Sequence, residues 1–136
     1  MLGQGDFHRA AELFAAIAET HAGGPLTAEA LFLRGAALDS AGDLEGAGVA
    51  WLESFAANPN GPQAADALLG LSRAMSAKAG PQEGCFYLQE IIARFPAAPQ
   101  AAEAERRIAE TGCDAPAEPL DEDLDPEAAA DMADDG

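Results

Sequence analysis

Residues 27–59 read TAEALFLRGAALDSAGDLEGAGVAWLESFAANP, and this stretch decides the fold. Apolar residues recur at helical spacing on both sides of a central Ala-Gly-Asp turn, which predicts two amphipathic helices. Gly35 and Ala47 have little or no side chain, so the two helix backbones can approach closely, and Trp51 fills the space beside that contact. Pro59 ends the second helix because proline cannot continue it. Such a pair cannot bury its own apolar face and therefore needs neighbouring helices.

The spacing of large and small residues in this stretch resembles that of the tetratricopeptide repeat, a helix–turn–helix unit. The matching positions are Leu31, Arg34, Gly35 and Leu38 on the first helix, Ala47, Trp51 and Ser54 on the second, and Pro59 at the end. This resemblance implies an all-α solenoid of antiparallel helix pairs.

The same pattern recurs along the chain with a period of 37 residues. The corresponding residues are Pro59 and Pro96; Pro25, Pro62 and Pro99; Phe14, Trp51 and Leu88; and Ala10, Ala47 and Gly84. The period exceeds the usual length of about 34 residues, which predicts longer loops near residues 21–26, 58–63 and 95–100.

We expect six helices, at residues 7–20, 27–40, 44–57, 63–78, 81–94 and 99–111. Thr27 and Asp43 are expected to be N-caps, Pro81 to lie in a first turn, and Gly112 to end the last helix. The helix at 7–20 has the pattern of a second helix in its unit, so its first helix is expected upstream of residue 1. The alternative is a solenoid that begins on a lone helix. The repeat domain is thus expected to cover residues 1–113, with the first helix of its first repeat missing.

Charge and composition argue against several classes of protein. The net charge is -17, with 24 acidic and 7 basic residues, so we expect no nucleic-acid binding, which needs clustered Lys and Arg. No apolar run approaches the roughly 18 residues of a membrane span, so we expect no membrane insertion. Residues 114–136 carry ten acidic residues and no basic one, which predicts a disordered tail that is either only solvated or has an interaction role.

No catalytic, metal-binding or cofactor-binding motif is found in the sequence. His8 and His21 are not spaced to share one face of a helix, and we expect surface histidines. Trp51 and Phe14 are expected in the core. The sequence therefore predicts a protein without enzymatic activity, metal or cofactor. Only a catalytic domain upstream of residue 1 would support the alternative that the protein is an enzyme.

Cys85 and Cys113 are the only cysteines. Cys85 precedes Pro96 by 11 residues and Cys113 follows Pro99 by 14 residues, so a rise of about 1.5 Å per residue brings both to the same end of a helical hairpin. A disulfide there is reasonable and would stabilise the terminal helix by roughly 3 kcal/mol. It would imply an oxidising compartment. The alternative is two separate buried thiols in a cytosolic protein.

Residues 2–113 resemble the C-terminal domain of the YbgF (CpoB) family of the Tol-Pal system. The resemblance rests on the 37-residue period, GDFHRAAELF, the loop Gly24-Pro25-Leu26, GDLEGAGVAWLESF, GCFYLQEIIARFP and the terminal AETGC. It implies a periplasmic, non-enzymatic adaptor that binds TolA and coordinates outer-membrane constriction with septal peptidoglycan synthesis in cell division. Members of the family carry a signal peptide and a trimerising coiled coil that this sequence does not contain, so oligomerisation is left open. The acidic tail departs from the pattern.

A partner peptide is expected in a groove lined by the first helix of each unit. The expected groove residues are Glu29, Phe32, Ala36 and Asp39, then Leu69, Arg73 and Ser76, and then Glu103, Arg106 and Glu110. Phe32 and Leu69 would offer apolar contacts, with Arg73 and Arg106 holding the peptide. The alternative for Phe32 is packing against a neighbouring helix. The alternative function is another tetratricopeptide binding module, either a relative of outer-membrane assembly lipoproteins or a cytosolic chaperone adaptor.

Overall fold

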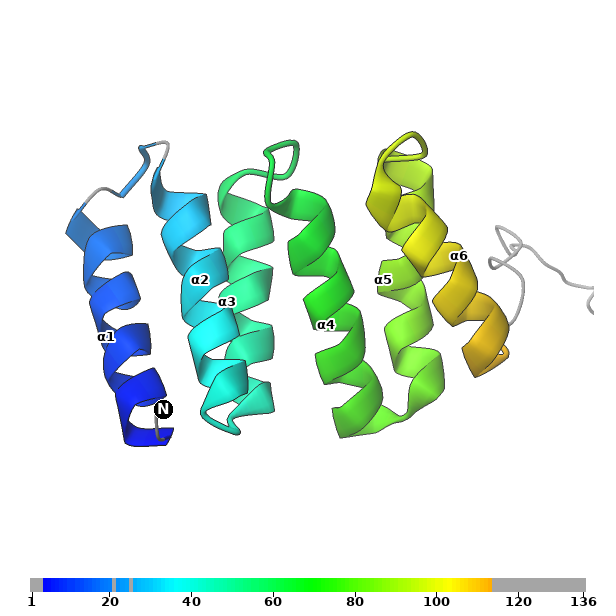
Figure 1. The fold of residues 1–136 in the computed structure, drawn as a ribbon. Coiled ribbons are helices and arrows are strands. Elements are labelled where there is room, and N and C mark those ends of the chain that lie inside the picture. The colour runs from blue at the N-terminus through cyan, green and yellow to red at the C-terminus, as the bar shows by residue number, and fades with distance from the viewer. Residues whose placement is uncertain (1–3, 21, 25, 114–136) are drawn as a thin grey trace, which may run out of the picture.

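The computed structural model describes residues 4–20, 22–24 and 26–113. These residues form six α-helices and no strand, as the sequence predicts (Figure 1). The helices are α1 (Gln4–Thr20), α2 (Leu26–Ser40), α3 (Leu44–Ala57), α4 (Ala64–Ala79), α5 (Pro81–Arg94) and α6 (Pro99–Thr111). The bounds of α3, α5 and α6 are those expected, α1 and α2 begin three residues and one residue earlier, and α4 is shifted by one residue at both ends. The predicted acidic tail, residues 114–136, lies outside the described residues.

Most of the predicted helix ends are confirmed. Asp43 caps α3, and its Oδ1 accepts a hydrogen bond of 2.9 Å from the backbone N–H of Gly46. Pro81 lies in the first turn of α5. Gly112 ends α6 in the left-handed conformation, with φ at 79°, and its N–H bonds to the Ile108 carbonyl.

The prediction that Thr27 caps the second helix is wrong. The helix α2 begins at Leu26, so Thr27 lies inside its first turn. The backbone N–H of Thr27 already donates to the Gly24 carbonyl at 3.2 Å, so the preceding loop closes this turn through its own backbone. The threonine side chain is therefore not in the position of a cap.

Consecutive helices run antiparallel and pack side by side in one row (Figure 1). In that view α2, α4 and α6 lie toward the reader, with α3 and α5 behind them, and α4 also contacts α6. The helices α3 and α5 begin and end 37 residues apart, which is the period found in the sequence. Each helix therefore contacts mainly its neighbours in the row.

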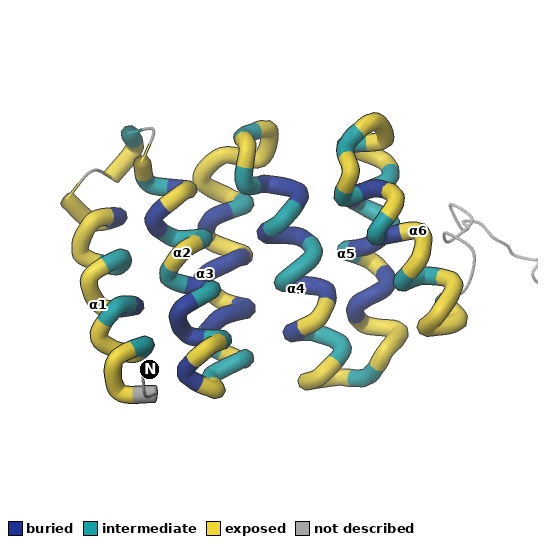
Figure 2. The backbone as a smooth tube through the Cα atoms, viewed as in Figure 1, coloured by how far each residue is buried: buried dark blue, intermediate teal, exposed yellow. Residues whose placement is uncertain are grey.

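The core consists of two clusters of buried residues between the facing sides of the helices (Figure 2). The first lies between α1 and α4 and contains Trp51, whose ring packs between Gly35 of α2 and Gly70 of α4. A Cβ atom at Gly35 would lie 2.6 Å from Cδ1 of this ring, and one at Gly70 would lie 2.7 Å from Cδ2. The second cluster lies between α4 and α6 and contains the fully buried Ile91. Two glycines thus leave the space that the one tryptophan fills.

Candidate functional site

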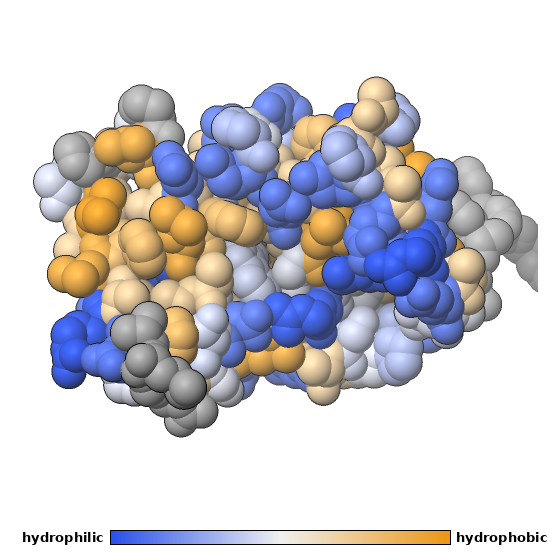
Figure 3. All heavy atoms as spheres, viewed as in Figure 1, coloured by the Kyte–Doolittle hydropathy of each residue, from blue (hydrophilic) through white to orange (hydrophobic). Residues whose placement is uncertain are grey.

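The candidate site is a hollow of about 370 Å³ between α4 and α6. It brings together five of the ten residues expected in the groove: Arg73, Ser76, Glu103, Arg106 and Glu110. In Figure 3 this region carries a concentration of hydrophilic residues over α4 and α6. Because α4 and α6 are in contact, residues some 30 positions apart in the sequence face the same space.

Three carboxylate–guanidinium contacts form the α6 wall of this hollow. Arg106 donates to Glu103 and, at 2.8 Å, to Glu110, and Arg107 donates to Glu103 at 2.7 Å. The hydrogen bonds from Arg106 and Arg107 hold the pKa of the Glu103 carboxyl below its usual value. The same contact with Glu103, together with that to Glu110, raises the pKa of Arg106. Both shifts favour the charged forms of Glu103 and Arg106, so these contacts form a charged network along α6.

The α4 wall is tied to the neighbouring helices by polar contacts across the row. Arg73 donates to both carboxylate oxygens of Asp39 on α2, at 2.6 and 3.3 Å, and its guanidinium lies 5.7 Å from the centre of the Trp51 ring. Gln100 of α6 donates to Asp66 of α4 at 3.0 Å. The first contact orients Arg73 in the hollow, and the second joins α6 to α4 outside it.

The remaining expected groove residues are distributed differently. Asp39 reaches the hollow through its contact with Arg73, whereas exposed Glu29 lines a separate hollow between α1 and α2. Phe32 is half-buried and packs against the core cluster around Trp51, which is the alternative that the sequence left open. Leu69 is half-buried and packs against the second cluster, and Ala36 is also half-buried. Apolar contact surface is thus scarcer along this groove than expected.

Sequence reasoning missed four residues that line the hollow: Ser72, Leu88, Arg107 and Thr111. Arg107 follows Glu103 by four positions, a spacing typical of helical ion pairs, so the sequence did hold a signal for it. Leu88 is the counterpart of Trp51 in the repeat period, and both Leu88 and Ser72 are buried. Ser72 donates to the Gly84 carbonyl at 3.0 Å, which is consistent with a packing role.

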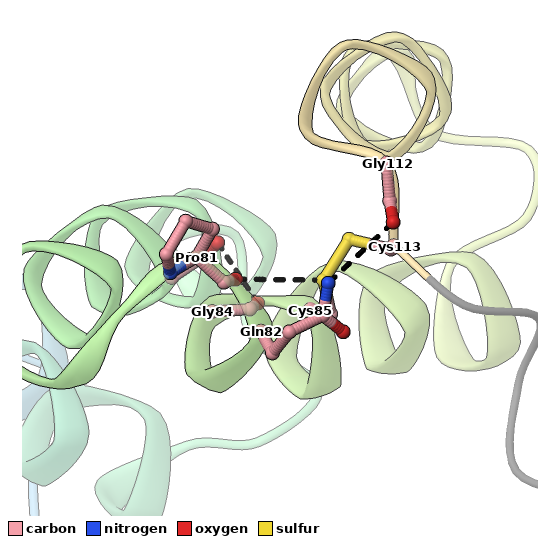
Figure 4. The surroundings of a disulfide bond; sticks show 7 residues. Pro81, Gln82, Gly84, Cys85, Gly112 and Cys113 are labelled. Carbon is pink, nitrogen blue, oxygen red and sulfur yellow. Dashed lines mark hydrogen bonds between the residues drawn. A yellow bond between two sulfur atoms is a disulfide. The ribbon is translucent and has the colours of Figure 1, made fainter.

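The predicted disulfide between Cys85 and Cys113 is confirmed (Figure 4). The two Cα atoms are 5.9 Å apart, within the usual range for such a bond. It joins the first turns of α5 to the residue that follows the C-cap of α6, and Gln82 also donates to the Gly112 carbonyl at 3.5 Å. The disulfide therefore anchors α6, and with it the wall of the hollow that carries Glu103 and Arg106.

Within the described part of the chain, no three His, Cys, Asp or Glu residues are arranged to hold a metal ion. His21 lies outside that part. None of the described helices combines the length and apolar character needed to cross a membrane. No protein-family model matches the chain, and a search of curated proteins found no matching relative.

Proposed function

We propose that this protein is a non-enzymatic peptide-binding module built from tetratricopeptide repeats. Support comes from the 37-residue offset between α3 and α5 and from the close helix contacts at Gly35 and Gly84. The observation that carries the proposal is the convergence of Arg73, Ser76 and Arg106 on one hollow between alternate helices of the row. Repeat proteins of this kind bind extended or helical segments on such surfaces.

The chemistry of the hollow favours a ligand that has both acidic and polar groups. Each guanidinium is already engaged by a carboxylate of this chain, yet the side chains of Arg73 and Arg106 are 46% and 57% exposed. A carboxylate of the ligand can therefore replace Asp39 or Glu110 without burying an unpaired charge. Ser76 adds a hydroxyl group, and Leu88 supplies an apolar contact at the base. Binding on this basis is expected to weaken with added salt.

The narrower proposal places the protein in the Tol-Pal system, as a periplasmic adaptor that binds TolA and links outer-membrane constriction to septal peptidoglycan synthesis. It rests on the resemblance of residues 2–113 to the YbgF family. The Cys85–Cys113 disulfide supports it, because such bonds persist mainly in oxidising compartments such as the periplasm.

The test is a titration of the ¹⁵N-labelled protein with the purified periplasmic fragment of TolA from the same organism, followed by NMR. We expect saturable shifts that cluster at Arg73, Ser76 and Arg106. Shifts confined to another surface would overturn the assignment of the hollow. Absence of shifts at high concentration would overturn the Tol-Pal proposal, and a peptide array would then test whether the hollow binds any acidic segment.

Two single variants make the titration specific. Arg106→Ala removes one guanidinium from the hollow, whereas Arg9→Ala removes an exposed one from α1, where Arg9 pairs with Asp6 in the same helix. Both changes remove exposed ion pairs and should alter stability by less than about 1 kcal/mol. We expect Arg106→Ala to weaken binding about tenfold and Arg9→Ala to leave it unchanged. Phe32 is unsuited to this purpose because it packs against the core.

A further inference from the structure

Three large apolar residues on α3 and α5 are exposed although both helices have neighbours on both sides. Val49 and Leu52 of α3 are 52% and 50% exposed, and Phe86 of α5 is 61% exposed. Because α3 contacts α2 and α4, and α5 contacts α4 and α6, no further helix of the row would lie alongside them. Val49 and Phe86 share one position of the 37-residue period, and at that position α1 carries the exposed, charged Glu12. The repeat therefore does not require an apolar residue there.

A hollow of about 130 Å³ lies beside these residues, on the side of the row that faces away from the reader in Figure 1. Val49, Leu52 and Met75 line it, and Tyr87 lines it from α5. Its size is comparable to that of cavities of about 150 Å³ that hold a benzene-sized group, so it has room for one apolar side chain. The Tyr87 ring packs edge-to-face against the Phe86 ring, with the ring centres 5.1 Å apart. The hollow and Phe86 thus form one apolar surface, which we call the α3–α5 patch.

The chain leaves the described fold beside this patch. Cys113 is the last described residue, and its disulfide joins it to Cys85, which directly precedes Phe86 and Tyr87 in α5 (Figure 4). Successive residues of a helix point about 100° apart. Cys85 faces α6, Phe86 points into water, and Tyr87 faces the hollow. A segment that continues from Cys113 can therefore reach the hollow by passing over Phe86.

The sequence that follows Cys113 suits this path. It begins DAPAEPL, in which Pro116 and Pro119 are three positions apart and Leu120 comes next. Segments with two prolines at this spacing are recognised on aromatic side chains in the extended polyproline II conformation. At about 3.1 Å per residue, the seven residues from Cys113 to Leu120 span up to about 22 Å, which is enough to pass around a helix about 10–12 Å wide.

Charge favours a segment of the same chain over a second copy. Two chains of net charge -17 repel one another, whereas a segment attached at Cys113 is present at a high effective concentration. At the rim of the hollow the exposed Lys78 pairs with the exposed Glu45 at 3.1 Å, so the rim has no net charge. Apolar contacts therefore dominate, and docking should depend little on salt, unlike binding in the α4–α6 hollow.

We propose that residues 116–120 of this chain dock on the α3–α5 patch. The two prolines pack on the ring of Phe86, and the side chain of Leu120 fills the hollow beside Tyr87. The acidic residues that follow Leu120 stay in water. The patch uses other residues of α4 than the α4–α6 hollow does, so the proposal does not depend on the proposed function.

NMR spectroscopy of the whole ¹³C,¹⁵N-labelled chain tests this contact. We expect nuclear Overhauser effects between the Leu120 methyl groups and the Tyr87 ring. They should be lost in Phe86→Asp and retained in Leu13→Asp, which changes a similarly exposed apolar residue on α1. Their absence in the wild type, or their persistence in Phe86→Asp, would overturn the proposal.

A second pair of variants leaves the described fold unchanged. Leu120→Asp should shift the amide signals of Val49 and Tyr87, whereas Met132→Asp, farther along the chain, should not. Unchanged signals in Leu120→Asp would overturn the proposal. Effects between a labelled and an unlabelled copy in a mixed sample would also overturn it, in favour of docking between two chains.

Proteolysis measures how much of the protein is docked. Glutamyl endopeptidase cleaves after Glu118, which lies within the docked segment. Phe86→Asp should raise the initial rate of this cleavage about tenfold, as expected for losing the burial of one large apolar side chain, because the rate follows the undocked population. Leu13→Asp should leave the rate unchanged. Equal rates in the wild type and Phe86→Asp would overturn the proposal.

Discussion

Trp51 is the residue on which most of the packing between α2, α3 and α4 depends. Its ring occupies the space left by Gly35 on one side and Gly70 on the other. Its Nε1–H is buried and has no hydrogen-bond partner among the described residues, so the ring contributes through packing and through the guanidinium of Arg73. The buried N–H without a partner is unfavourable, and the close packing of the ring between three helices offsets this.

Gly35→Ala tests this arrangement. The added methyl group would overlap the Trp51 ring, whose shift costs about 1–3 kcal/mol of unfolding free energy, more than the gain from alanine's helix propensity. Urea unfolding followed by tryptophan fluorescence measures the difference. Gly5→Ala in α1 is the control, because nothing lies within 4 Å of its added Cβ. A Gly35→Ala protein as stable as the wild type would show that the contact is not close.

The ion pairs of Glu103 make a prediction about pH. Arg106 and Arg107 lower the pKa of the Glu103 carboxyl in the folded state. The ionised carboxyl therefore stabilises the fold at pH values above the pKa that Glu103 has in the unfolded chain. That contribution is lost as the pH falls through the lower, folded pKa. An NMR titration of the Glu103 side-chain carboxyl carbon should give a pKa below 4.5, which rises in the Arg106→Gln, Arg107→Gln double variant. An identical pKa in both proteins would contradict the assignment of the shift to these arginines.

At the scale of the element, α6 depends on the disulfide more than the other helices do. It follows α5 in the row, contacts α4 only slightly, and no described helix covers its other side. The bond between Cys85 and Cys113 spans 28 residues and fixes the far end of the α5–α6 hairpin. It therefore replaces part of the packing that a helix on the other side would provide.

Replacing both cysteines by alanine should reduce the unfolding free energy by about 3 kcal/mol, chiefly because the unfolded chain regains the entropy of an open loop. Chemical denaturation with and without a reductant measures the effect. The reductant should destabilise the wild type and leave the Cys85→Ala, Cys113→Ala variant unchanged. A wild type that is indifferent to complete reduction would refute this role of the bond.

For the whole molecule, contacts between neighbouring helices imply that stability varies along the row. The helices α2 to α5 pack on both sides, whereas each terminal helix packs mainly on one. Hydrogen exchange followed by mass spectrometry should therefore find the slowest exchange in α3 and α4 and faster exchange in α1. After reduction of the disulfide, the amides of α6 should exchange faster than they do in the oxidised protein. Uniform protection across all six helices would indicate a single cooperative unit instead.

The sequence by itself determined most of the local structure and predicted a disulfide, with two separate thiols as the alternative. Helix bounds follow from signals that act within a few residues, such as the Asp43 cap, the proline in the first turn of α5 and the glycine after α6. Because the pattern repeats every 37 residues, the helix bounds of one unit predict those of the next. A disulfide could be predicted because helix length places Cys85 and Cys113 at one end of a hairpin, and the structure contains that bond.

Only the tertiary structure decided which surface residues act together. Phe32 and Leu69 look available on a single helix, but packing against other helices partly buries both. The arginines of the α4–α6 hollow are engaged by carboxylates that include Asp39 of α2, which no local pattern indicates. Likewise Ile17 and Ile91 have the same residue type and repeat position but opposite burial. Burial depends on which helices lie alongside, a property of the assembled row rather than of any single segment.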